Sequence, residues 1–175
     1  SWPEYGNPSD WGPECSLVID SLSRLCDAAY DFNAAVMPAK LSADPRAVYG
    51  ASQDAVETLL ATLTSESFQT NVIVIAHVQY LELPDGTTKG FPQGVGQKLS
   101  PKIPQYFPSY VLYQNKGGKR KIVTMSTPLV DLANPAPFKI EKEYPIETGL
   151  ADIFAALRDP PTPVEKPKAL TLQRR

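Results

Sequence analysis

The chain has 175 residues, and 42% of them are hydrophobic, which suffices for a buried core and argues against global disorder. No apolar run approaches the roughly 20 residues of a membrane helix, and no secretory leader is recognisable, so we expect a soluble protein without a membrane partner. Two cysteines and one histidine exclude a disulfide framework and argue against structural zinc.

The net charge of −2 conceals a strong segregation of charge along the chain. Residues 1–85 carry 12 acidic and three basic side chains, whereas residues 86–130 carry seven basic side chains and no acidic one. Five aromatic residues interleave this basic stretch, namely Phe91, Tyr106, Phe107, Tyr110 and Tyr113. Cationic groups among aromatic faces suit phosphates and stacked single-stranded bases, although a plain solvated basic face is the alternative.

The first half alternates strand and helix patterns. Residues 1–14 have the composition of a loop, and residues 15–19 form a short apolar run typical of a buried strand. Helical spacing follows over residues 21–36 and again over about 47–64, separated by two prolines. Residues 72–78, which are rich in β-branched side chains, predict a second buried strand. This order predicts an α/β fold with parallel strands and flanking helices.

The second half predicts less regular structure. Residues 80–96 contain several glycines and read as a long irregular loop. Residues 110–115 and 120–126 predict a β-hairpin closed by residues 116–119, which include two adjacent glycines. Thr148 is a candidate cap for a last helix, and residues 159–175 read as a flexible tail rich in proline and lysine.

Asp20 is a candidate magnesium-site residue. It ends the strand of the segment SLVIDS, and ligands of open α/β sheets gather at the carboxyl ends of strands. A carboxylate there can hold Mg²⁺ beside the phosphates of a nucleotide. The alternative is that Asp20 and Ser21 simply begin the following helix.

His77, the one histidine, ends the second strong strand pattern. A polar residue at that position can sense the phosphates of a nucleotide bound at a neighbouring strand end. The alternative is a hydrogen-bonded histidine at a strand terminus. Gln79 is a second polar candidate on the same segment.

The order of these features resembles the second half of a RecA-like P-loop ATPase core. The stretches LVIDSLSRL, GFPQGVGQKLSPKIPQYF and PAPFK with ETGLADIF are similar to RecA-like ATP-binding proteins of tailed phages and prophages. The resemblance covers about residues 11–158. It implies a partial RecA-like domain over residues 1–158, with a mostly parallel sheet, flanking helices and a C-terminal β-hairpin. It also implies a cytoplasmic location in a bacterial host.

The resemblance implies roles for individual residues. Asp20 matches the Walker B carboxylate, His77 a sensor at the next strand end, and Lys139 a residue that reaches the nucleotide of a neighbouring subunit. Residues 80–96 match the second DNA-binding loop, where Lys89 and Phe91 are the expected contacts to phosphate and base. The remaining expected DNA contacts are Lys98, Lys102, Lys116, Lys119, Arg120 and Lys121. Single-stranded DNA and further copies of the chain are the implied partners, and ATP with Mg²⁺ the implied cofactor.

One part of the family pattern is missing. No Gly-rich run precedes a Lys-Ser or Lys-Thr pair, so the Walker A loop that cradles phosphates is absent. The chain therefore resembles the portion of an ATPase from Walker B onward, and we expect no turnover of ATP by it alone. A sheet without the central strand of the phosphate loop has an open edge. The alternative function is a non-catalytic module that binds single-stranded nucleic acid or assists assembly.

Overall fold

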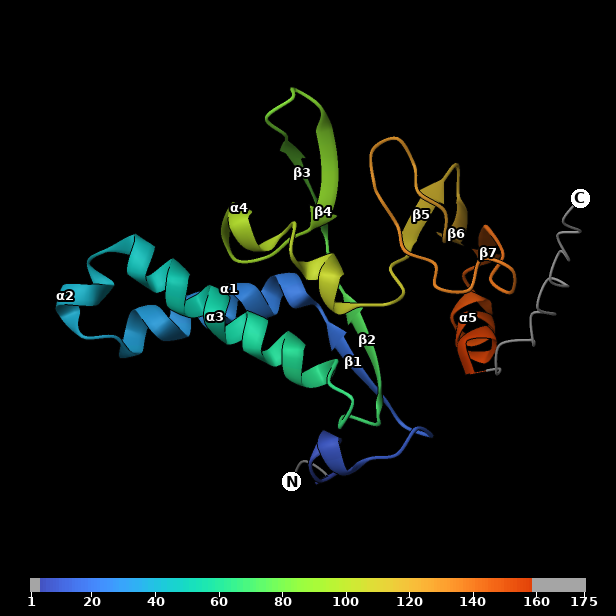
Figure 1. Ribbon diagram of the computed structural model, residues 1–175. Coiled ribbons are helices and arrows are strands. Elements are labelled where there is room, and N and C mark those ends of the chain that lie inside the picture. The colour runs from blue at the N-terminus through green and yellow to red at the C-terminus, as the bar shows by residue number, and fades with distance from the viewer. Residues whose placement is uncertain (1–3, 159–175) are drawn as a thin grey trace, which may run out of the picture.

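A computed structural model describes residues 4–158 and shows a mixed α/β protein whose strands form three small sheets (Figure 1). The predicted tail over residues 159–175 lies outside the described residues. Three parts extend in different directions from the first sheet (Figure 1). They are a helical arm (residues 22–63), a β-hairpin (residues 78–92) and a C-terminal lobe (residues 110–158).

The first sheet pairs β1 (Ser16–Asp20) with β2 (Asn71–Ile75) in parallel. The connection contains α1 (Leu22–Val36), the short α2 (Ala39–Ser42) and α3 (Pro45–Leu63). Ser21 caps α1 by accepting a hydrogen bond from the Arg24 amide, and Asp44 caps α3 with a proline at its first position. Both strands and both long helices agree with the sequence prediction. A 3₁₀ turn at Pro8–Asp10 precedes them.

The main hydrophobic core joins the two long helices to residues 93–106, the segment that follows the β-hairpin of residues 78–92. Its buried residues are Leu22, Cys26, Val56, Leu60, Val95, Leu99 and Ile103. Val74 of β2 packs against this core and shares a sheet face with Ile19, its partner in the register. The segment contributes through α4 (Gly96–Leu99) and the 3₁₀ turn at Ile103–Tyr106.

Residues 80–96 do not form the irregular loop that the sequence predicts. β3 (Val78–Glu82) pairs antiparallel with β4 (Thr88–Pro92) around a turn at residues 83–87. The glycines misled the interpretation, because Gly86 serves the turn with a φ of 81° while Gly90 lies inside β4. A Cβ at Gly90 would lie 2.8 Å from Val78 and 2.9 Å from Val130, so this strand position needs a residue without a side chain.

The C-terminal lobe is an antiparallel three-stranded sheet with one helix. β5 (Leu112–Lys116), β6 (Lys119–Val123) and β7 (Glu143–Pro145) pair in that order, and α5 (Gly149–Arg158) packs beside them. Gly117 and Gly118 form the predicted turn, with φ of 60° and 80°. Ile122, Ile140, Tyr144 and Ile153 form a second, separate core.

The expectation of a mostly parallel sheet holds for β1 and β2 alone. All other strand pairings within residues 4–158 are antiparallel. In the two hairpins the physical reason is connection length, because parallel neighbours need a crossover of a dozen or more residues and the turns at residues 83–87 and 117–118 are much shorter. The turns of the two hairpins allow only antiparallel pairing.

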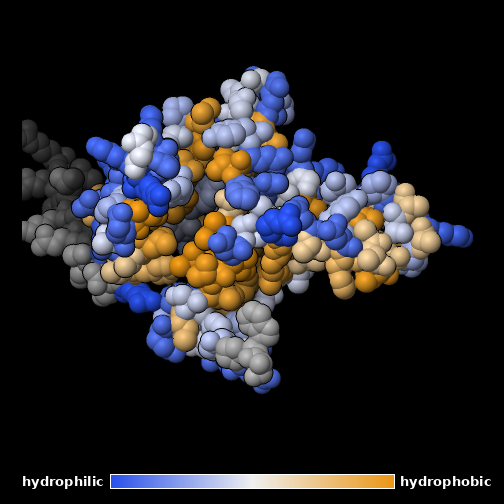
Figure 2. Space-filling model, turned by 180° about the vertical axis from the view of Figure 1, so that it is seen from behind, coloured by the Kyte–Doolittle hydropathy of each residue, from blue (hydrophilic) through white to orange (hydrophobic). Residues whose placement is uncertain are grey.

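The parallel pair presents an apolar face that the helices leave uncovered. Val18 and Ile75 lie on the face opposite Ile19 and Val74, and their exposed fractions are 52% and 44%. Figure 2 shows apolar side chains gathered at the centre of the molecule, between the hairpin and the helical arm. Neither strand has a second neighbour among the described residues, so both sheet edges are open.

Candidate functional site

Asp20 lies at the carboxyl end of β1, where the sequence placed it. Its side chain is exposed, and a cis peptide bond joins it to Ser21. Ser21 provides the helix cap through its hydroxyl, at 3.4 Å from the Arg24 amide nitrogen. The capping role that was the alternative for the Asp20–Ser21 pair therefore belongs to Ser21, and the carboxylate of Asp20 is not used as the cap.

His77 lies just beyond the carboxyl end of β2, on the same edge of the sheet as Asp20. The register pairs Asp20 with Ile75, and His77 follows two residues later with an exposed side chain. Its backbone is held firmly, because its amide donates to Ser23 Oγ at 3.1 Å and its carbonyl accepts from the Gln93 amide at 2.8 Å. The two candidate residues thus share one end of the parallel pair.

The residues at this edge fit only part of a magnesium–nucleotide complex. A single carboxylate such as Asp20 suits Mg²⁺ that a nucleotide brings with it, since this ion keeps several waters and few protein ligands. Among the described residues, no group of three His, Cys, Asp or Glu side chains is placed to hold a metal ion. The chain also lacks the glycine-rich loop that supplies backbone N–H groups to phosphates. The edge by itself therefore does not fit ATP.

Residues 86–130 contain seven basic side chains and no acidic one, and three of these cations pair with carboxylates from elsewhere in the chain. Lys89 pairs with Asp131 and Lys102 with Glu57, each at 2.8 Å, and Lys121 pairs with Glu143. Glu57 raises the pKa of Lys102, chiefly by accepting its hydrogen bond. In residues 4–158, no carboxylate pairs with the other four cations, Lys98, Lys116, Lys119 and Arg120.

Three of these unpaired cations lie at the tip of the β5–β6 hairpin. Lys116 and Lys119 face each other beside the turn, and Arg120 faces Asn115. Because side chains alternate along a strand, Arg120 projects from the opposite face to Lys119 and Lys121. The three consecutive basic residues 119–121 are therefore divided between two faces of the hairpin. All the side chains at its tip are exposed.

The β3–β4 hairpin, which replaces the predicted DNA-binding loop, has different surroundings. Lys89 is bound to Asp131, and Phe91 is half-buried opposite Gln79. Gln79 accepts a hydrogen bond from Ser100 Oγ at 3.2 Å. The turn carries one charged side chain, the acidic Asp85, whose pKa is lowered by hydrogen bonds from Thr87. This hairpin thus offers fewer free cations than the β5–β6 hairpin.

Lys139 lies in a tight turn over Ala136–Ile140 and is half-buried. Both its amide and that of Ile140 donate to the Ala136 carbonyl at 2.9 Å. The turn packs on the second core through Ile140, so Lys139 belongs to the C-terminal lobe rather than to the edge of Asp20 and His77.

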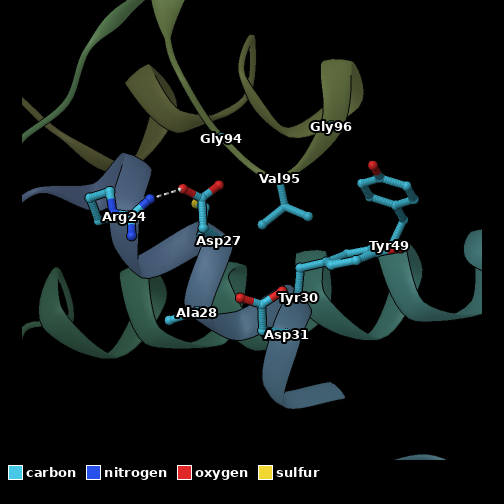
Figure 3. A pocket seen from close by; sticks show the side chains of 10 residues that line it. Arg24, Asp27, Ala28, Tyr30, Asp31, Tyr49, Gly94, Val95 and Gly96 are labelled. Carbon is cyan, nitrogen blue, oxygen red and sulfur yellow. Dashed lines mark hydrogen bonds and ion pairs between the residues drawn. The ribbon is translucent and has the colours of Figure 1, made fainter. Parts of the chain in front are cut away.

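A shallow groove of about 470 Å³ lies between α1, α3 and the Gly94–Gly96 segment (Figure 3). Asp27 and Asp31 line it together with the rings of Tyr30 and Tyr49, whose centroids are 4.7 Å apart. Asp27 already forms an ion pair with Arg24 at 3.0 Å. Acidic groups repel phosphates, so we do not include this groove in a nucleic-acid surface.

Two exposed aromatic residues of the C-terminal lobe were not singled out by sequence reasoning, which counted Tyr113 among the five aromatic residues of the basic stretch and assigned no role to Phe138. Tyr113 on β5 is 52% exposed, and Phe138 is fully exposed in the Ala136–Ile140 turn. The predicted hairpin with its glycine turn contained the signal for Tyr113, since it fixes which residues share a face. No sequence signal indicates that Phe138 is exposed.

Comparisons with protein-family models, with curated proteins and with solved structures find no match to this chain. No helix within residues 4–158 has both the length and the apolar character needed to cross a bilayer. The RecA-like resemblance therefore rests on the motifs quoted above, and the structure adds a mixed α/β fold with one parallel strand pair.

Proposed function

We propose that the chain is the DNA-facing portion of a phage-type RecA-like ATP-binding protein that acts on single-stranded DNA in recombination or annealing. The observation that carries this proposal is the placement of Asp20 and His77 at one end of the parallel β1–β2 pair. The carboxyl ends of parallel strands are where nucleotides bind in open α/β sheets. The open edges and the uncovered apolar face of the same pair suit a sheet that further strands complete.

The DNA-binding part of the proposal rests on the β5–β6 hairpin. Lys116, Lys119 and Arg120 are exposed there and lack carboxylate partners among the described residues. Exposed cations on a protruding hairpin are suited to the phosphates of a single strand. ATP turnover by this chain alone is not expected, because no phosphate loop is present.

Two measurements test the proposal. Fluorescence anisotropy with labelled oligothymidine should show binding that weakens as salt rises, and Lys116→Glu with Lys119→Glu should abolish it. Lys102→Glu is the matched control, because Glu57 already neutralises that cation. In the second measurement, the chain alone should show no ATP hydrolysis, because the edge by itself does not fit ATP, and Asp20→Ala should weaken DNA binding. A measurable ATPase rate that Asp20→Ala removes would contradict the proposed lack of turnover.

A second candidate is a non-catalytic module that binds single-stranded nucleic acid. The three unpaired cations of the hairpin favour it, because they need no nucleotide to act. It predicts the same salt-dependent binding with no effect of ATP, and full binding by Asp20→Ala and His77→Ala. Comparing these two variants with the lysine reversals distinguishes the two functions.

A further inference from the structure

We propose that Tyr113 and Phe138 form a stacking surface for the bases of single-stranded nucleic acid, with Arg120 as the adjoining phosphate contact. This inference rests on the proposed binding of single strands and specifies where the bases lie. Neither aromatic residue belongs to the stretch that resembles a DNA-binding loop.

The strand register places Tyr113 and Arg120 on one face of the C-terminal sheet. Tyr113 is opposite Ile122, which in turn is opposite Tyr144, so these three side chains share a face. Arg120 is two residues from Ile122 on β6 and therefore lies on the same face, diagonal to Tyr113. An aromatic ring and a guanidinium group are thus neighbours on a strand pair.

The same face is apolar and buried at one end and exposed at the other. Ile122 and Tyr144 are covered by Ile140 and Ile153 and are 3% and 9% exposed. Tyr113 lies on the outer strand of the sheet, where 52% of it remains exposed. Arg120 is the only charged side chain that β5, β6 and β7 place on this face. An exposed ring beside an unpaired cation fits a base and its phosphate.

Phe138 adds a second ring on a rigid support. Asn134 holds the Ala136–Ile140 turn from both ends, because its Oδ1 accepts from the Ala136 amide at 3.0 Å and its Nδ2 donates to the Ile140 carbonyl at 3.4 Å. Ile140 anchors the turn on the core face that Tyr113 borders. The neighbouring Ala133 forms a β-bridge with Tyr110, two residues before the strand that carries Tyr113 begins at Leu112. A fully exposed phenyl ring that is held this firmly suits stacking, since little further ordering is needed on binding.

The test uses the whole chain and an oligothymidine that contains one 2-aminopurine, whose fluorescence is quenched when it stacks. We expect Tyr113→Ala and Phe138→Ala each to weaken binding by about five- to hundredfold and to reduce the quenching. The slope of affinity against salt should stay unchanged in both, because neither residue contacts phosphate. Tyr113→Phe should retain affinity, while Arg120→Gln should lower the salt slope.

Phe32→Ala is the matched control, since Phe32 is 65% exposed on the acidic helix α1 and should not affect binding. If the wild type binds but Tyr113→Ala and Phe138→Ala bind equally well with full quenching, the stacking surface is wrong and the proposed function stands. If the wild type does not bind even at low salt, the proposed function itself fails. Circular dichroism of each variant confirms that it is folded.

Discussion

The hydroxyl of Ser23 accepts a hydrogen bond from the backbone amide of His77 at 3.1 Å. The same oxygen lies 3.5 Å from the Gln93 carbonyl, so a single buried side chain ties the start of α1 to the link between β2 and β3 and to the end of β4. Ser23 thereby positions the backbone of His77, one of the two candidate residues at this end of the sheet.

Ser23→Ala should lower the free energy of unfolding by about 1–3 kcal/mol, because it leaves the His77 amide without its acceptor. Urea denaturation followed by circular dichroism measures this. Ser9→Ala, at an exposed hydroxyl, should change the stability by less than about 0.5 kcal/mol. Equal stabilities of the two variants would show that the Ser23 bond contributes nothing.

Gly90→Ala should destabilise the protein by about 1–3 kcal/mol, since the new methyl group overlaps the side chains of Val78 and Val130. Gly50→Ala is the opposite case. Gly50 lies in α3, and no atom lies within 4 Å of the position that an added methyl group would occupy, so alanine should raise the helix stability by about 0.5–1 kcal/mol. Thermal unfolding of the two variants should shift in opposite directions, and a higher unfolding temperature for Gly90→Ala would contradict the packing of Gly90.

Cys26 should resist thiol reagents in the folded protein. Burial raises the pKa of its thiol to about 11, and only 2% of the residue is exposed. At pH 8 the thiolate that reacts with Ellman's reagent is therefore scarce at this position. We expect the Cys15→Ser variant to show no rapid reaction until denaturant is added. A rapid reaction in the native state would mean that the core around Cys26 is open.

Tyr110 should make the protein sensitive to alkaline pH. Burial, with a smaller effect of the Asp131 carboxylate, raises the pKa of Tyr110 to about 12, above the value of about 10 for an exposed tyrosine. Folding therefore favours the neutral phenol, and this contribution is complete below pH 10 and is lost as the pH rises towards 12. Tyr110→Phe should lose less stability than the wild type over that interval in urea titrations. Parallel curves for the two proteins would contradict this.

The sequence predicted the elements whose signals are local. The apolar runs before Asp20 and His77, the helical spacing of α1 and α3, and the adjacent glycines at 117 and 118 all correspond to observed elements. Local signals suffice there because each element is specified by its own periodicity or turn chemistry.

Long-range relationships could not be predicted in the same way. Lys89, Lys102 and Lys121 appeared free in the sequence, and their partners Asp131, Glu57 and Glu143 lie 42, 45 and 22 residues away. The β3–β4 hairpin was missed because Gly90, read as a loop signal, is required by a contact with Val130 from another part of the chain. Charge pairing and close packing of this kind depend on tertiary structure.

The presence of two separate cores has a consequence for how the protein unfolds. The core around Leu60 and the core around Ile122 share no residue, and polar contacts such as the hydrogen bond from Gly90 to the Leu129 carbonyl join the two parts. We therefore expect each core to open without the other, and amide hydrogen exchange should then reveal two cooperative units with different opening free energies. Because the basic hairpin belongs to one unit and the Asp20–His77 edge to the other, protection of amides on the hairpin alone upon addition of DNA would locate the ligand on the C-terminal unit.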